Sequence, residues 1–246
     1  MALVSHPTST ADLLHTASQR LVRTVDSLDG DAWARPSLLP RWTVAHVLAH
    51  VALNAEALAG VLTGVAHGRP VSMYASQDAR DGDIAELGAA EPAEIRDRVF
   101  ASVTRFSDAL AALPEDRAGE RVERTPGSGT FFPAGAAASM RLREVEIHHA
   151  DLDAGYAPAD WPDEFTIRLL DHVAGHFTDH PAGTSGGSGF RAEATDLGRT
   201  WEFGTGDATV TGTGHELAWW ATGRPAYPGT TGPTSADGML PRANAI

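Results

Sequence analysis

The chain has 246 residues and no cysteine, and its 32 acidic and 19 basic residues give a formal net charge of −13. This length suits one large or two small domains with a substantial core, and the negative charge argues against binding to nucleic acid or anionic membranes. The absence of cysteine excludes disulfides, thiolate-bound zinc and a protein-borne thiol nucleophile, so any thiol chemistry requires a small-molecule thiol.

No apolar run approaches the roughly 20 residues that cross a bilayer. The first residues, MALVSHPTSTADLL, also lack the basic and then apolar regions of a secretory signal. We therefore expect a cytoplasmic protein that spans no membrane.

Four segments in the first 155 residues carry apolar side chains at helical spacing. The first starts at a Thr10 or Asp12 cap, the second starts at a Thr43 cap, and proline punctuates both ends of the third. The predicted helices are residues 10–28, 43–64, 92–113 and 139–156. Four long helices with connecting loops predict an antiparallel bundle, in which inward side chains of facing helices build sites.

The segment AGYAPADWPDE, residues 154–164, contains two prolines and a glycine and indicates a domain boundary. The expected fold class is α+β, with a four-helix bundle over residues 1–155 and a smaller α+β domain over residues 156–246. In the second domain, alternating and β-branched residues predict short strands between two helices. The predicted elements are a helix at 164–180, strands at 190–196, 200–204 and 208–212, and a helix at 215–224.

The stretch SMRLREVEIHHADLDAGY places Glu144 and His148 one turn apart, at the centre of its more apolar arc. Glu146, His149 and Asp153 fall on the opposite arc, which we expect to face solvent. A carboxylate on a core-facing arc is costly unless it is paired, protonated or bound to a metal. Glu144 and His148 therefore form either a buried hydrogen bond or part of a metal site.

The second predicted helix offers a partner for this pair. His50 lies at the centre of its apolar arc, with His46 and Asn54 one turn away on the same side. Two neutral imidazoles and one carboxylate are a ligand set of catalytic zinc sites. His50 is favoured because it is nearer the middle of the bundle, and His46 remains an alternative ligand. The outward arc of this helix consists of Ala45, Ala49, Ala52, Ala55 and Glu56.

Other candidate sites are weaker. His172, His176 and His180 recur every four residues on the later helix, but no carboxylates accompany them, which indicates a surface row or partly packed histidines. Neither TGTGHE nor GTSGGSG opens a βαβ unit with the spacing of a nucleotide-binding loop. No serine, aspartate and histidine are spaced as in a hydrolase.

Four motifs, RWTVAHVLAHVALNAEAL, MYASQDARDGDIAE, FPAGAAASMRLREVEIHHADL and AWWATGR, occur in this order between about residues 38 and 224. Together they resemble the mycothiol-dependent maleylpyruvate isomerase family, one of the DinB-like metal-binding helical bundles. The resemblance implies an N-terminal bundle that holds a divalent metal, usually zinc, and a smaller C-terminal α+β domain.

The resemblance also implies roles for individual residues. It assigns the metal to His50, Glu144 and His148, and it places an active-site arginine at Arg224 in the terminal GR motif. Arg80, within ARDGDI, is its candidate for anion binding. Interaction with the end of a helix is the alternative role of Arg224.

Through this resemblance, the expected function is cis–trans isomerisation of maleylpyruvate to fumarylpyruvate in gentisate degradation, with mycothiol adding to the double bond and leaving after rotation. The expected partners are a small-molecule substrate and this thiol. A mycothiol S-transferase, or an isomerase of another cis-enoyl acid on the same scaffold, is the nearest alternative. The other alternative is a non-enzymatic helical bundle in which the His/Glu cluster only forms hydrogen bonds.

Overall fold

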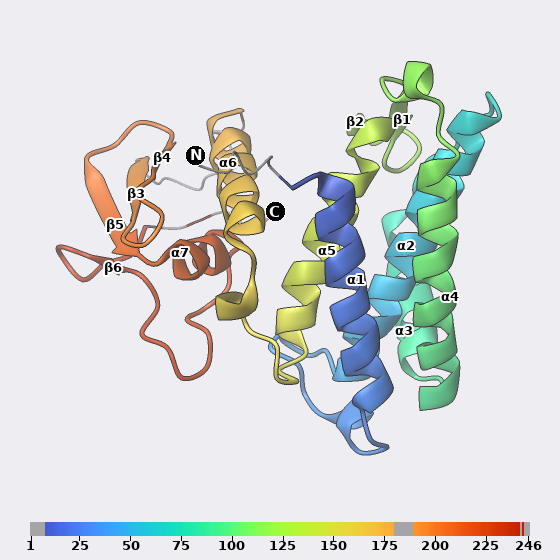
Figure 1. The fold of residues 1–246 in the computed structure, drawn as a ribbon, viewed down its shortest axis with the longest axis horizontal. Helices are drawn as coiled ribbons and strands as arrows, with labels where there is room; N and C mark the ends of the chain where they lie inside the picture. Colours follow the sequence, from blue (N-terminus) through green and yellow to red (C-terminus); the bar gives the residue numbers. More distant parts are fainter. Residues whose placement is uncertain (1–7, 180–188, 242, 244–246) are drawn as a thin grey trace, which may run out of the picture. The chain divides into compact units, whose positions relative to one another are not determined.

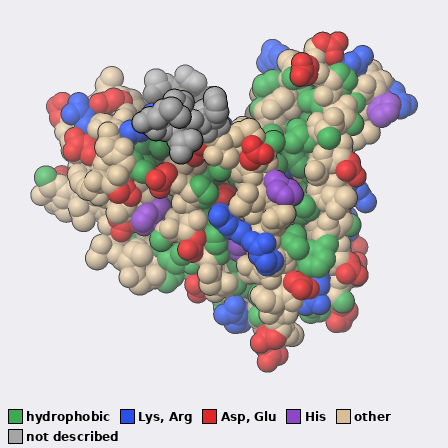
Figure 2. Space-filling model, viewed as in Figure 1, with side chains coloured by type: hydrophobic (Ala, Val, Ile, Leu, Met, Phe, Trp, Pro, Cys, Tyr) green, Lys and Arg blue, Asp and Glu red, His purple; other side chains and the backbone are tan. Residues whose placement is uncertain are grey.

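A computed structural model of the protein describes residues 8–179, 189–241 and 243. The chain divides into two compact units, an N-terminal one over Thr8–Gly155 and a C-terminal one from Tyr156 onward. On the face shown in Figure 2, acidic and arginine side chains are interspersed over the visible surface, as a chain with 32 acidic and 19 basic residues implies.

The N-terminal unit is mainly helical (Figure 1). Four long helices lie side by side as a bundle, and a shorter helix, α3, packs against α2. An antiparallel hairpin of two short strands precedes the last helix. The elements are α1 (Thr10–Ser27), α2 (Val44–Ala66), α3 (Gln77–Gly88), α4 (Pro92–Ala111), β1 (Arg121–Glu123), β2 (Phe131–Pro133) and α5 (Ala137–Asp151).

The predicted bundle is confirmed, with shifted helix ends. Thr43 caps α2 as predicted, but Ser9 caps α1 in place of Thr10 or Asp12, because its side chain accepts a hydrogen bond from the Asp12 backbone N–H. The last helix ends at Asp151 because Asp153 takes a left-handed φ of 49°. Pro92 occupies the first turn of α4, where its missing N–H costs nothing.

Helix α2 is buried on nearly all sides. The alanines predicted to face outward, Ala45, Ala49, Ala52 and Ala55, are at most 7% exposed. That prediction is wrong because α3, α4 and α5 all pack against α2. Among the described residues, α2 is also a helix long and apolar enough to cross a membrane, contrary to the expectation that no segment would be. However, 72% of its most apolar window is buried, as in a core helix.

The C-terminal unit combines two helices with a four-stranded sheet of order β4-β3-β5-β6. Strand β3 is antiparallel to β4 and parallel to β5, and both helices lie beside the sheet (Figure 1). The predicted helices and strands, and with them the α+β class, are confirmed. The elements are α6 (Asp163–Asp179), β3 (Phe190–Ala194), β4 (Thr200–Phe203), β5 (Ala208–Gly212), α7 (Gly214–Ala221) and β6 (Thr234–Ser235).

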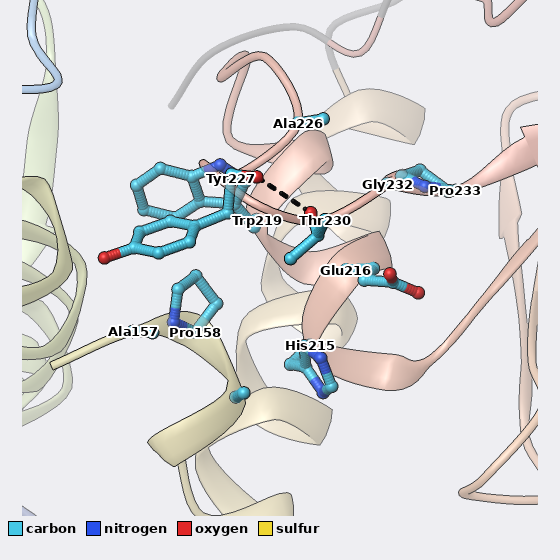
Figure 3. A pocket seen from close by; sticks show the side chains of 11 residues that line it. Ala157, Pro158, His215, Glu216, Trp219, Ala226, Tyr227, Thr230, Gly232 and Pro233 are labelled. Carbon is cyan, nitrogen blue, oxygen red and sulfur yellow. Dashed lines mark hydrogen bonds between the residues drawn. The ribbon is translucent and has the colours of Figure 1, made fainter.

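Aromatic side chains form the core of this unit. Phe190 of β3 stacks on Phe203 of β4 with 4.5 Å between ring centroids, and Phe177 of α6 and Trp220 of α7 pack edge-on against this pair. Nearby, Trp219 helps to line a cavity of about 40 Å³ (Figure 3). A cavity of that size holds water rather than a substrate, so we interpret it as a packing gap.

Candidate metal centre

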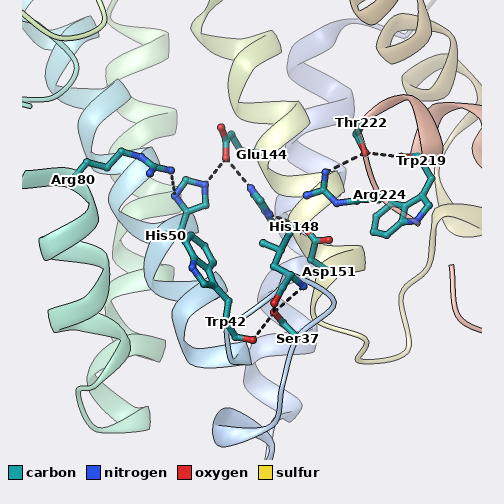
Figure 4. Close-up of polar contacts among 11 residues, drawn as sticks. Ser37, Trp42, His50, Arg80, Glu144, His148, Asp151, Trp219, Thr222 and Arg224 are labelled. Carbon is teal, nitrogen blue, oxygen red and sulfur yellow. Dashed lines mark hydrogen bonds and ion pairs between the residues drawn. The ribbon is translucent and has the colours of Figure 1, made fainter. Parts of the chain in front are cut away.

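His50 of α2 and the pair Glu144 and His148 of α5 converge in the N-terminal unit (Figure 4). The Oε2 atom of Glu144 lies 2.8 Å from Nε2 of His50 and 3.3 Å from Nε2 of His148. The two imidazole rings are nearly perpendicular, at 87°, and their centroids are 4.7 Å apart. One carboxylate oxygen thus faces both imidazoles.

The three side chains fit a single divalent ion. Their ligand atoms all lie within 4.8 Å of one another. A tetrahedral zinc ion with bonds of about 2 Å holds its ligand atoms roughly 3–3.5 Å apart, so small side-chain movements suffice. Two nitrogens and one oxygen leave a coordination position for substrate or water, as in catalytic zinc sites.

Packing of α2 against α5 explains why these residues meet. The side chain of His50 is 5% exposed, whereas that of Glu144 is 29% exposed, so the cluster is buried on the α2 side and open beside α5. A site that binds a small molecule needs such an opening.

Asp151 holds His148 in place. Its carboxylate is completely buried and lies 2.8 Å from Nδ1 of His148. An ionised carboxylate can only accept a hydrogen bond, so the imidazole proton sits on Nδ1 and Nε2 is left for a metal. No role was predicted for Asp151 from the sequence, although its spacing of three residues from His148 was an available signal.

Arg80 of α3 approaches the cluster from the other side (Figure 4). Its Nη2 atom lies 3.3 Å from Nδ1 of His50, and its Nη1 atom donates to Asp81 at 2.7 Å. The structure therefore places this sequence-predicted arginine beside the candidate metal ligands. Its role in anion binding stays a prediction.

The pKa values of the three groups follow from their contacts. Burial lowers the pKa of His50, which favours the neutral imidazole that metals bind. For Glu144, burial raises the pKa, but the charges and hydrogen bonds of His50 and His148 outweigh it and hold the pKa well below its usual range. For His148, burial lowers the pKa, but hydrogen bonds to Asp151 and Glu144 more than offset this and raise it.

The opposite side of α5 is not solvated as predicted. Glu146 and His149 are each 1% exposed, and only Asp153 of that arc is exposed as expected. The reason is that α1 covers this side: Nε2 of His149 lies 2.8 Å from Oγ1 of Thr24. Burial and the charge of Arg20 lower the pKa of His149 to about 3, so it stays neutral.

Within the described residues, the other candidate histidines lie outside the cluster. His46, the alternative ligand, instead contacts the Thr43 cap of α2, with Nδ1 2.7 Å from Oγ1 of Thr43. His172 and His176 are exposed on α6, which agrees with a surface row. His180 lies outside the described residues.

Arg224 belongs to the C-terminal unit, just after α7. Its Nη1 atom donates to Oγ1 of Thr222 at 3.1 Å, and its guanidinium carbon lies 5.1 Å from the centroid of the Trp219 ring (Figure 4). These contacts orient the side chain. Its catalytic role stays a prediction.

Comparison with known proteins gives consistent results along the chain. Residues 14–153 match the "Mycothiol maleylpyruvate isomerase N-terminal domain" and residues 160–245 match the "MDMPI C-terminal domain". A crystal structure of the mycothiol-dependent maleylpyruvate isomerase is 28% identical, with a TM-score of 0.85, and the match covers 96% of this chain and 95% of that one.

Other relatives agree. A histidine-to-alanine mutant of that isomerase is 27% identical, with a TM-score of 0.84 over the same shares of the two chains. An uncharacterized protein of Mycobacterium tuberculosis, present in strains H37Rv and CDC 1551, is 27% identical over 223 residues, which cover 87% of this chain and 84% of the relative. The motifs, the fold and these matches together show that the chain belongs to the mycothiol maleylpyruvate isomerase family.

Proposed function

We propose that the chain is a metal- and mycothiol-dependent cis–trans isomerase that converts maleylpyruvate to fumarylpyruvate. The observation that carries this proposal is the convergence of His50, Glu144 and His148 within 4.8 Å, in a chain whose family and structural neighbours bear the name of this activity. The donor set favours zinc among divalent ions.

The reaction requires a nucleophile because a carbon–carbon double bond cannot rotate until its π bond is broken. The thiolate of mycothiol, its proton already lost to solvent, forms a bond to one alkene carbon, and the π electrons move onto the conjugated keto group to give an enolate. After rotation about the resulting single bond, these electrons return, the double bond re-forms and the thiolate is expelled unchanged. The chain has no cysteine, so the sulfur must come from the small molecule.

The chain's own residues prepare this step. Glu144 supplies one negative charge and the two imidazoles are neutral, so a bound divalent ion would retain positive charge with which to lower the pKa of the thiol or stabilise the developing enolate. Asp151 fixes the orientation of His148. We assign a carboxylate of the substrate to the guanidinium group of Arg224, which can bind a carboxylate through two hydrogen bonds, and we keep Arg80 as a further candidate for anion binding.

A direct assay tests the proposal. Purified zinc-loaded protein is incubated with mycothiol and maleylpyruvate, and the loss of the enol absorbance is followed. We expect turnover that requires both the thiol and the metal. Arg224→Ala should lower kcat/KM by about 10- to 100-fold, because a charge-assisted hydrogen bond contributes about 1.5–3 kcal/mol.

Two results would contradict the proposal. Turnover at the same rate without mycothiol would exclude the thiol mechanism. Stable mycothiol adducts with electrophiles, without turnover of maleylpyruvate, would assign the chain to thiol transfer instead.

A further inference from the structure

An arginine in the core of the N-terminal unit has no part in the roles described above. Arg141 belongs to the same helix, α5, as Glu144 and His148, and it is 1% exposed. It precedes Glu144 by three residues, so the two side chains leave the helix on the same side. A charged side chain in the core, next to the candidate metal ligands, calls for a physical reason.

The guanidinium of Arg141 stays charged although it is buried. Burial lowers its pKa to about 10, while the negative charge of Glu144 acts to raise it, so the group is a cation at neutral pH. Among the described residues its hydrogen-bond acceptors are both neutral: Nη1 donates to the backbone carbonyl of Val51 at 2.7 Å and to Oδ1 of Asn54 at 3.1 Å. The buried Nη2 atom has no hydrogen-bond partner in the same part of the chain. This cation is therefore only partly compensated.

Stability alone does not account for such a residue. Burying a charge without an ionic partner is costly, and well-packed apolar side chains can often take the place of buried charged groups without loss of stability. A methionine would fill a similar volume at Arg141 with no charge to desolvate. The position of its two contacts indicates a different reason for the arginine.

These contacts join the two helices at the metal ligands. Val51 directly follows His50 on α2, and Asn54 lies one turn beyond His50. At the other end, Arg141 lies nearly one turn before Glu144 on α5, which packs against α2. The hydrogen bonds of Arg141 therefore connect α2 beside its one ligand to α5 beside its two ligands.

The geometry of the cluster depends on this spacing. His148 is oriented by Asp151 within its own helix, whereas His50 comes from a different helix. The three ligand atoms lie within 4.8 Å of one another, and one ion can bind them all only while the two helices keep their separation and register. A contact that spans both helices can hold that arrangement.

We propose that Arg141 is a positioning residue that fixes α2 against α5, so that His50 reaches the ion held by Glu144 and His148. It acts through the backbone of Val51 and the side chain of Asn54, not by contact with the ion. This inference goes beyond the proposed reaction but rests on its metal centre.

Three variants test the bridge. Arg141→Met removes its hydrogen bonds and its charge, whereas Arg141→Lys keeps the charge on a shorter side chain without the planar guanidinium. Asn54→Leu removes one acceptor and leaves the arginine. Arg117→Met is the matched control, because Nη1 of Arg117 also donates to a backbone carbonyl of α2 at 2.7 Å, that of Val65 near the far end of the helix.

The readouts are zinc affinity, measured by chelator competition, and the visible spectrum of the cobalt-substituted protein, which reports the coordination geometry. We expect zinc affinity to fall about tenfold in Arg141→Met and Arg141→Lys, at the lower end of the effect of losing an outer contact of a metal site. Their cobalt bands should shift and weaken, and Asn54→Leu should change the bands in the same direction. Arg117→Met, which loses the same kind of hydrogen bond, should keep the affinity and spectrum of the unaltered protein.

The outcomes separate this inference from the proposed function. Unchanged zinc affinity and cobalt spectra in Arg141→Met and Asn54→Leu would overturn the positioning role while the metal centre stands. If Arg141→Met does not fold, an Asn54→Leu spectrum identical to that of the unaltered protein has the same meaning. Full retention of both properties in Arg141→Lys would also overturn the role, because the charge alone would then suffice. Spectra that depend on Arg141, in a protein that turns over maleylpyruvate without mycothiol, would support the positioning role and contradict only the proposed reaction.

Discussion

At the residue scale, the two candidate histidine ligands have different neighbours. His148 donates from Nδ1 to the buried carboxylate of Asp151, which is a common arrangement around metal-bound histidine. His50 instead has the guanidinium of Arg80 beside its Nδ1 atom. The orientation of His148 is therefore fixed by a negative acceptor within its own helix.

Replacing Asp151 should weaken metal binding without removing a ligand. In Asp151→Asn the charge that orients His148 is lost, and we expect zinc affinity to fall about 10- to 100-fold, the usual effect of losing such a partner. Competition with a chromogenic chelator measures this affinity without reference to activity.

Asp153→Asn is the control, because Asp153 is exposed just beyond the same helix. We expect its zinc affinity to match that of the unaltered protein. Equal affinities for all three proteins, with unchanged helical circular dichroism, would show that Asp151 does not position His148.

The residue pattern correctly predicted which side chains would come together. It was a poorer guide to which side chains would be exposed to solvent. Helical spacing singled out Glu144, His148 and His50 because it gives the direction in which a side chain leaves its helix. It could not show that α1 covers the opposite side of α5 and buries Glu146 and His149. Whether a face meets solvent depends on neighbouring helices, and one helix's sequence does not contain that information.

At the element scale, α2 is the central helix of the N-terminal unit. Its alanines allow α3, α4 and α5 to approach closely. Ala52→Leu should therefore lower the free energy of unfolding by about 1–3 kcal/mol, the usual cost of overpacking a filled core. Chemical denaturation followed by circular dichroism measures the change.

Gly60 on the same helix provides the matched comparison. It is exposed, and a Cβ added there meets nothing within 4 Å. Gly60→Ala should raise the free energy of unfolding by about 0.5–1 kcal/mol, because alanine favours the helix. An Ala52→Leu variant with an unchanged free energy of unfolding would show that this side of α2 is open, as the apolar pattern alone had suggested.

Helix α3 and the β1–β2 hairpin were not predicted, and the reason is physical. Helix α3 buries only Ile84 and Leu87, so it lacks an apolar repeat, and its start depends on a Ser76 cap. The hairpin strands have three residues each. Yet α3 carries Ala79, Arg80 and Asp83, so the element with the weakest sequence signal forms one wall of a cleft of about 270 Å³ in the N-terminal unit.

At the scale of the whole molecule, the α+β class was predictable because the two parts of the chain differ in period. Apolar residues recur at helical spacing up to about residue 155, and alternating strand patterns appear only after the proline-containing segment 154–164. The motifs also identified the family, and both matched domains agree with it. The cleft could not be predicted, because it is formed by side chains from three helices and a connecting segment.

The most direct test of this account is the metal content of the purified, zinc-supplemented protein. Elemental analysis should find one divalent ion per chain, and His50→Ala and Glu144→Ala should each lose it while keeping their helical circular dichroism. His46→Ala, which removes a histidine outside the cluster, should retain the ion. A folded protein that binds no divalent ion, or a His50→Ala variant that keeps it, would contradict the account.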